Sequence, residues 1–148
     1  MLRVGIIGYG YWGINLVRNF SQLDSCAVCG VSDPREERLK LLKKIYPNIN
    51  AVTDSNTIIN DPAIDAIVIA TPAFSHFKLA KQALLAGKSV LVEKPMSSTV
   101  AEAEELIGIA ETKNKILMVD HTYLYTGAVD RMKTMIDSGD IGKVKYFD

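Results

Sequence analysis

The stretch Leu2-Arg3-Val4-Gly5-Ile6-Ile7-Gly8-Tyr9-Gly10-Tyr11-Trp12-Gly13 decides the fold. Residues 2–7 are almost entirely apolar, which predicts a short buried strand, and residues 11–22 continue with apolar side chains at helical spacing. The glycines therefore lie between a strand and a helix. There Gly8 permits a tight turn, Gly10 lets the backbone approach a phosphate, and Gly13 lets the helix pack closely. With the free N–H groups of the helix N-terminus, this predicts a dinucleotide pyrophosphate site; a tight turn without a ligand is the alternative.

The rest of the chain alternates between apolar runs and helical patterns. The apolar runs predict further strands at residues 26–31, 49–53, 64–70, 89–93 and 116–119. Helical spacing or capping residues predict helices at residues 35–46, 75–86, 99–113 and 126–137, with a short one after Asp54. Strands that alternate with helices indicate βαβ units, and strands that are apolar throughout indicate a sheet covered on both faces. The predicted fold is α/β, a doubly wound parallel sheet.

The pattern changes at residues 138–142, Ser-Gly-Asp-Ile-Gly. Residues 143–148 alternate between polar and apolar side chains, which predicts a strand with one wet face. We therefore expect one domain at residues 1–138, and at residues 139–148 the start of a second domain that is otherwise missing. The neighbours of this last strand would come from the missing sheet.

Composition excludes several classes of protein. The 148 residues contain 17 basic and 17 acidic side chains, whereas a nucleic-acid binder needs a basic excess. No apolar run approaches the roughly 20 residues of a membrane span, and the N-terminus lacks the pattern of a secretory signal. Cys26 and Cys29 lie three apart in a predicted strand, on opposite faces, so we expect buried structural cysteines and no metal site. A cytoplasmic protein with a small-molecule partner is predicted.

Asp33 follows Gly13 by 20 residues, at the end of the second predicted strand. A carboxylate at this distance is expected to accept hydrogen bonds from the adenosine ribose and to repel a 2′-phosphate, which favours NAD over NADP. Arg35 is evidence in the other direction, because an arginine here can hold a 2′-phosphate. Asp33 could also cap a helix that begins with Pro34 at its first position.

Polar side chains collect where three later strands end. Their sequences are Ala70-Thr71-Pro72, Glu93-Lys94-Pro95 and Asp120-His121-Thr122. The carboxyl ends of parallel strands form the ligand crevice, so we expect these residues beside a nicotinamide and its substrate. Lys94 is interpreted as functional rather than as an exposed lysine packed along its stem, because Pro95 fixes the backbone beside it.

These motifs resemble the glucose–fructose oxidoreductase / inositol dehydrogenase family (Gfo/Idh/MocA). The resemblance rests on Glu93-Lys94-Pro95, preceded by Ala70-Thr71-Pro72 with His76 and by the glycine turn, and it covers the whole chain. It implies a Rossmann-type NAD(P)-dependent oxidoreductase, or dehydrogenase, that acts on a sugar, sugar-nucleotide or cyclitol hydroxyl. It also implies that Lys94 lies by the nicotinamide and the reacting hydroxyl, that a cis bond precedes Pro95, and that the full-length protein is a homo-oligomer.

The expected site combines the motif positions with those implied by the resemblance. Lys94 is the expected catalytic residue, and the fragment alone is expected to be inactive. The expected cofactor-binding residues are Gly8, Tyr9, Gly10, Tyr11, Trp12, Gly13, Asp33, Arg35, Thr71, Pro72, His76, Glu93, Lys94, His121 and Thr122. Trp12 is also predicted to belong to the core, from its spacing to Leu16 and Phe20. The alternatives are a non-catalytic dinucleotide-sensing module and a different two-domain dehydrogenase.

Overall fold

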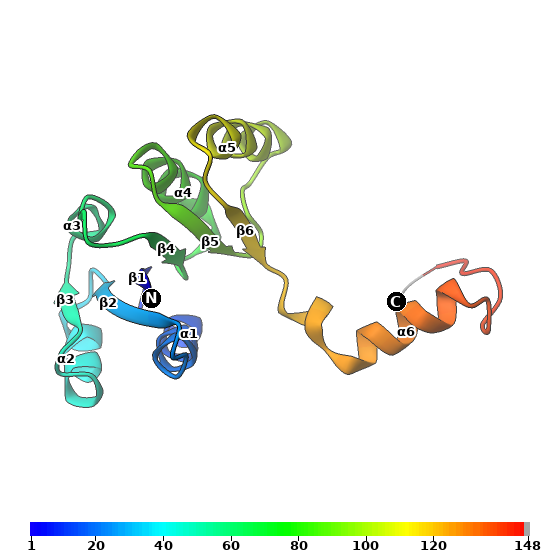
Figure 1. The fold of residues 1–148 in the computed structure, drawn as a ribbon, viewed down its shortest axis with the longest axis horizontal. Coiled ribbons are helices and arrows are strands. Elements are labelled where there is room, and N and C mark those ends of the chain that lie inside the picture. Colours follow the sequence, from blue (N-terminus) through cyan, green and yellow to red (C-terminus); the bar gives the residue numbers. More distant parts are fainter. Residues whose placement is uncertain (147–148) are drawn as a thin grey trace.

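The computed structural model describes residues 1–146, which form six strands, six α-helices and two short 3-10 helices (Figure 1). In chain order these are β1 (Leu2–Ile7), α1 (Tyr11–Ser21), β2 (Cys26–Ser32), α2 (Glu36–Ile45), β3 (Asn50–Val52), α3 (Ser55–Ile59), β4 (Ala66–Ile69), η1 (Ala73–Ser75), α4 (His76–Leu85), β5 (Ser89–Glu93), α5 (Val100–Lys113), β6 (Leu117–Asp120), η2 (Thr122–Tyr125) and α6 (Gly127–Asp137).

The six strands form one parallel sheet in the order β3-β2-β1-β4-β5-β6. After β1 the chain builds outward through β2 and β3, then returns to the other side of β1 with β4. This reversal creates a crevice between β1 and β4 at the carboxyl ends of the strands, which we call the carboxyl edge. The predicted doubly wound α/β fold is confirmed.

Each face of the sheet carries its own apolar core (Figure 1). On one face, residues of α3, α4 and α5 such as Ile58, Leu84 and Leu106 pack with Ile67 and Val92 of the strands. On the other, Val17 of α1 and Leu42 of α2 pack with strand residues such as Val31. Helices on both faces explain why the strands lack polar alternation.

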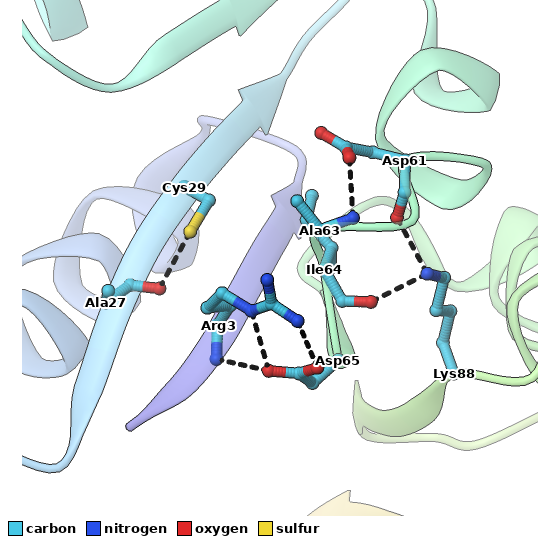
Figure 2. A network of polar contacts seen from close by, with 8 residues as sticks. All are labelled: Arg3, Ala27, Cys29, Asp61, Ala63, Ile64, Asp65 and Lys88. Atoms are coloured by element: carbon cyan, nitrogen blue, oxygen red, sulfur yellow. Dashed lines mark hydrogen bonds and ion pairs between the residues drawn. The ribbon is translucent and has the colours of Figure 1, made fainter.

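The opposite rim of the sheet, its amino edge, is held by the polar network in Figure 2. Arg3 donates from its backbone N and from Nε to Oδ2 of Asp65, and its Nη2 lies 3.0 Å from Oδ1. These hydrogen bonds from Arg3 lower the pKa of Asp65 to about 2. Nearby, the buried Lys88 donates to the carbonyl oxygens of Asp61 and Ile64, at 2.7 and 2.6 Å. The network joins β1, the loop before β4, and the start of β5.

Two predicted helix starts are confirmed, and a third is corrected. Asp54 caps α3 by accepting from the backbone N of Asn56, and Thr99 forms a capping box with Glu102 at α5. Helix α2 begins at Glu36 with Arg35 as its N-cap, so the alternative in which Asp33 caps a helix that begins at Pro34 does not hold. The carboxylate of Asp33 is instead bonded to Arg35 and to the glycine turn.

The prediction that Trp12 belongs to the core is also wrong, because its side chain is 47% exposed. Gly13 must face the sheet, and the buried stripe of α1 therefore runs through Gly13, Leu16 and Val17. Trp12 is one residue earlier and is rotated out of that stripe. Tyr9 is the aromatic residue of this turn that enters the core, with 1% exposure.

Helix α6 packs against η2 and extends away from the sheet (Figure 1). Residues 143–146 contain no strand, contrary to prediction, because no described strand lies beside them to supply ladder hydrogen bonds. Phe147 and Asp148, the remainder of that prediction, lie outside the described residues.

Cys26 and Cys29 are free thiols in β2. Both are half-buried rather than buried as predicted. Cys26 is the first residue of β2 and pairs with Leu2, whereas a register shift leaves Cys29 without a partner in β1. Among residues 1–146 no helix is long and apolar enough to cross a membrane.

Candidate functional site

The glycine turn joins β1 to α1 at the crevice. Gly8 has a positive φ of 97°, which favours glycine, and a Cβ there would lie 2.6 Å from the carbonyl oxygen of Ala70. A Cβ on Gly13 would collide with the carbonyl oxygen of Gly8. Around Gly10, by contrast, a Cβ would meet only Nη2 of Arg35, at 3.8 Å. Gly8 and Gly13 are thus required by packing, whereas Gly10 leaves open space through which a ligand can approach the backbone.

Asp33 lies at the end of β2, where its carboxylate is 2% exposed and fully hydrogen-bonded. Oδ2 accepts from the backbone N of Tyr9 at 2.8 Å and from Nη2 of Arg35 at 2.9 Å. Oδ1 accepts from the backbone N and from Nε of Arg35, at 3.0 and 2.9 Å. Burial acts to raise the pKa of Asp33, but these hydrogen bonds together outweigh it and lower the pKa. A carboxylate is therefore fixed beside the glycine turn.

A cleft of about 620 Å³ opens along this part of the carboxyl edge. Its floor is the glycine turn, and one wall carries Asp33 and Arg35. The opposite wall is built by the chain after β4. The cleft is lined by Gly8, Gly10, Tyr11, Trp12, Asp33, Pro34, Arg35, Ala70, Thr71, Pro72, Phe74, Ser75 and Leu79. Sequence reasoning missed Pro34, Phe74, Ser75 and Leu79; the signal for Phe74 was a large aromatic residue just after Thr71-Pro72.

His76 is buried at 1% exposure, at the start of α4, and it links two strand ends. Its Nδ1 lies 2.8 Å from the carbonyl oxygen of Pro95, and its Nε2 lies 2.8 Å from that of Thr71. Both ring nitrogens thus contact the backbone, and the ring is not available to a ligand in the cleft. His76 instead fixes the turn after β5 relative to the turn after β4.

Beyond His76 the edge continues with the ends of β5 and β6. Glu93 is 7% exposed, whereas Lys94 is exposed, and the Lys94–Pro95 bond is cis as the resemblance implied. Asp120, the last residue of β6, is the register partner of Glu93, although it was not among the expected site residues. Burial, and next the charge of Asp120, raise the pKa of Glu93, while Lys94 acts in the other direction.

The structure brings most of the predicted site residues to one rim, in two groups. The first group lines the cleft and consists of Gly8, Gly10, Tyr11, Trp12, Asp33, Arg35, Thr71 and Pro72. The second group, Glu93 and Lys94, lies at the end of β5, and Gly13 packs against the carbonyl oxygen of Gly8 outside the cleft lining. Tyr9 contributes only its backbone, since its side chain is in the core, and His121 and Thr122 are exposed after β6, outside the cleft lining. No group of three or more potential metal-binding side chains occurs within residues 1–146.

This arrangement of sheet reversal, glycine turn and strand-end carboxylate defines a dinucleotide-binding protein. The sequence pattern described as "Oxidoreductase family, NAD-binding Rossmann fold", that of Gfo/Idh/MocA proteins, matches residues 2–121. The chain belongs to this family of oxidoreductases.

Relatives within the family include an uncharacterized oxidoreductase and two inositol dehydrogenases. The chain is 36% identical to the uncharacterized oxidoreductase YdgJ of Escherichia coli, over 99% of this chain and 42% of that protein. It is 30% identical to the scyllo-inositol 2-dehydrogenase (NADP(+)) IolW of Bacillus subtilis, over 99% and 40% respectively. The crystal structure of myo-inositol 2-dehydrogenase from Lactobacillus plantarum superposes with a TM-score of 0.88 at 26% identity, covering 98% of this chain and 43% of that one. The chain thus spans about two fifths of the length of these relatives.

Proposed function

We propose that this chain is the NAD-binding domain of a dehydrogenase that acts, as a full-length protein, on a hydroxyl group of a sugar, sugar nucleotide or cyclitol. The observation that carries the proposal is the open backbone at Gly10 beside the buried carboxylate of Asp33. Two inositol dehydrogenases among the relatives support the substrate class. A cytoplasmic location and a homo-oligomer of the full-length protein stay predictions.

Residues along the carboxyl edge bind different parts of the cofactor and the substrate. The free N–H groups at the start of α1 bind the pyrophosphate, and Asp33 binds the adenosine ribose. A bound nicotinamide dinucleotide supplies hydride transfer. Lys94 then hydrogen-bonds the substrate hydroxyl and moves its proton. His76 maintains the relative position of the two turns that border this region.

The choice between NAD and NADP depends on the Asp33–Arg35 ion pair. A carboxylate has about four acceptor positions, and in Asp33 four donors already use them. Ribose hydroxyls must therefore displace part of the Arg35 side chain, which is 49% exposed and so able to move. An NADP 2′-phosphate would meet the buried carboxylate and would depend on Arg35 for its counter-charge. We propose that NAD is preferred.

Titration with NADH and with NADPH, followed by nicotinamide fluorescence, tests the proposal on the 148-residue chain. NADH is expected to bind more tightly. Asp33→Ala should narrow the difference between the cofactors, whereas Arg35→Ala should weaken NADPH and leave NADH equal or tighter. Equal or tighter binding of NADPH to the wild-type chain would remove the role of Asp33 and assign selectivity to Arg35.

A catalytic role for Lys94 is tested in a full-length protein. There Lys94→Ala should lower kcat far more than it weakens cofactor binding, because the amine acts on the reacting hydroxyl. An unchanged kcat would exclude this role.

A further inference from the structure

Two carboxyl groups lie together at the end of the sheet that is farther from Asp33. Glu93 ends β5, Asp120 ends β6, and the two are register partners. Register partners in a parallel pair project to the same face of the sheet. Glu93 is 7% exposed and Asp120 is half-buried, so bulk water screens their charges only partly.

Neither carboxyl group has a charged donor in the described part of the chain. Oε1 of Glu93 is buried without a hydrogen-bond partner, and Oδ1 of Asp120 accepts only from the hydroxyl of Thr122, at 3.2 Å. Lys94 follows Glu93, yet within residues 1–146 its side chain forms no ion pair. Ionising two neighbouring carboxyl groups together is costly when one of them is buried and neither is paired with a cation.

The other titratable groups on the elements that flank β5 either form hydrogen bonds with the backbone or have only a small effect on the pKa of Glu93. From α4, His76 contacts backbone oxygens with both ring nitrogens. From the first turn of α5, the carboxylate of Glu102 accepts from the backbone N atoms of Ser98 and Thr99. Lys94 lowers the pKa of Glu93, but burial and Asp120 act more strongly and raise it.

The strand order places this pair beside one end of a bound dinucleotide. Asp33 lies at the β2 side of the crevice and the glycine turn follows β1, so the adenosine half occupies that side. The other half must then cross to β4, β5 and β6, where Glu93 and Asp120 lie. The nicotinamide ring carries a positive charge when oxidised and none when reduced, so the two redox forms interact differently with a carboxylate pair.

We propose that Glu93 and Asp120 share one proton in the free protein, and that NAD⁺ binding releases this proton whereas NADH binding leaves it in place. The inference rests on the proposed function, because it requires the nicotinamide to lie at this edge. The released proton passes to solvent, and the pair, now doubly ionised, faces a cationic ring. By linkage, the affinity for NAD⁺ relative to NADH rises with pH.

Isothermal titration calorimetry of the 148-residue chain, in buffers with different ionisation enthalpies, counts the protons directly. We expect proton release when NAD⁺ binds and none when NADH binds. The ratio of the two dissociation constants should change by about fivefold or more as the pH rises from the ordinary glutamate value of 4.5 into the alkaline range. Binding of both cofactors without proton release, and with a constant ratio, would overturn the inference while leaving the proposed function intact. If neither cofactor binds at any pH, the proposed function fails as well.

Variants locate the proton. Glu93→Gln and Asp120→Asn should each abolish proton release and make the ratio independent of pH, whereas the exposed control Asp130→Asn should behave as wild type. Thermal unfolding checks that each variant is folded. If only one of Glu93→Gln and Asp120→Asn folds, that variant alone is enough for the test.

Carbon-13 NMR of the carboxyl groups tests, in the absence of any cofactor, whether Glu93 and Asp120 share a proton. The titration midpoint of Glu93 should move to lower pH in Asp120→Asn. An unchanged midpoint would show that the two groups do not share a proton.

Discussion

Asp33 and Glu93 occupy equivalent places at the two sides of the carboxyl edge, yet their pKa values move in opposite directions. Asp33 directly follows β2 and Glu93 is the last residue of β5, and both are buried, with 2% and 7% exposure respectively. Asp33 receives a backbone N–H and three donors of Arg35, which lower its pKa despite burial. Burial raises the pKa of Glu93, and the neighbouring carboxylate of Asp120 raises it further, which outweighs the opposing effect of Lys94. Hydrogen-bond partners, rather than burial, therefore decide which strand-end carboxylate is a fixed anion and which can take up a proton.

The largest effect is expected from breaking the support of Asp33. Gly13→Ala places a Cβ against the carbonyl oxygen of Gly8, which must shift the glycine turn and with it the N–H of Tyr9. We expect a loss of about 3 kcal/mol in the free energy of unfolding, measured by urea denaturation. Gly10→Ala is the matched control: its stability should stay within about 0.5 kcal/mol of wild type, while NADH binding weakens. Equal destabilisation by the two changes would contradict the assigned roles of these glycines.

Removing the first carboxylate should be costly as well. Asp33→Ala leaves the buried N–H of Tyr9 without its acceptor, at a cost of about 1–3 kcal/mol near neutral pH. Because the folded protein holds the pKa of Asp33 below its ordinary value of 3.8, this stabilisation is present above that value and is lost as the pH falls through the lowered pKa. Urea denaturation at neutral and acidic pH measures both effects. A difference between variant and wild type that persists in acid would refute the ionic origin.

The contribution of Glu93 to stability should depend on pH in the opposite direction to that of Asp33. The raised pKa of Glu93 means that its contribution is present below the ordinary value of 4.5 and is lost as the pH rises through the raised pKa. Glu93→Gln should therefore be more stable than wild type at high pH, by an amount on the order of 1 kcal/mol, and should lose this advantage in acid. Thermal unfolding across the pH range tests this. Destabilisation that is equal at every pH would instead indicate a packing role for the side chain.

The smallest effect is expected at the amino edge, where solvent screens the Arg3–Asp65 pair. These side chains are 45% and 38% exposed. Asp65→Asn should lower the melting temperature less than Asp33→Ala does. This effect should be present above pH 3.8 and should disappear as the pH falls to about 2, because the carboxylate of the wild type becomes protonated in that range. NADH affinity should not change, because the pair lies on the rim opposite the cleft. A change in affinity would show that the two edges are coupled.

Local sequence signals predicted the parts of this molecule that short stretches determine. The glycine turn, the capping residues Asp54 and Thr99, and the alternation of elements all specify backbone conformation within a few residues. The burial of Tyr9 in place of Trp12 was not predictable in this way, because it depends on which face of α1 Gly13 must present to the sheet.

Contacts between the ends of different strands could also not be predicted from the sequence. Asp120 lies 27 residues after Glu93, and only the register of β5 with β6 reveals that they are neighbours. Similarly, the ion pair of Arg35 with Asp33 was not predicted, because the sequence indicates only that Arg35 could contact a phosphate. The last predicted strand failed for a related reason, since a strand at residues 143–146 needs a neighbour that alternation alone does not supply.

The buried lysine of the amino edge has a consequence for how such a domain can evolve. Lys88 donates to the carbonyl oxygens of Asp61 and Ile64 and so anchors the loop before β4 (Figure 2). None of its partners belongs to the cleft or to the carboxyl pair. The polar contacts that anchor this loop and the residues that line the cleft are therefore separate sets. Substitutions among the contacts of Lys88 can be selected without changing a residue of the cleft or of the carboxyl pair.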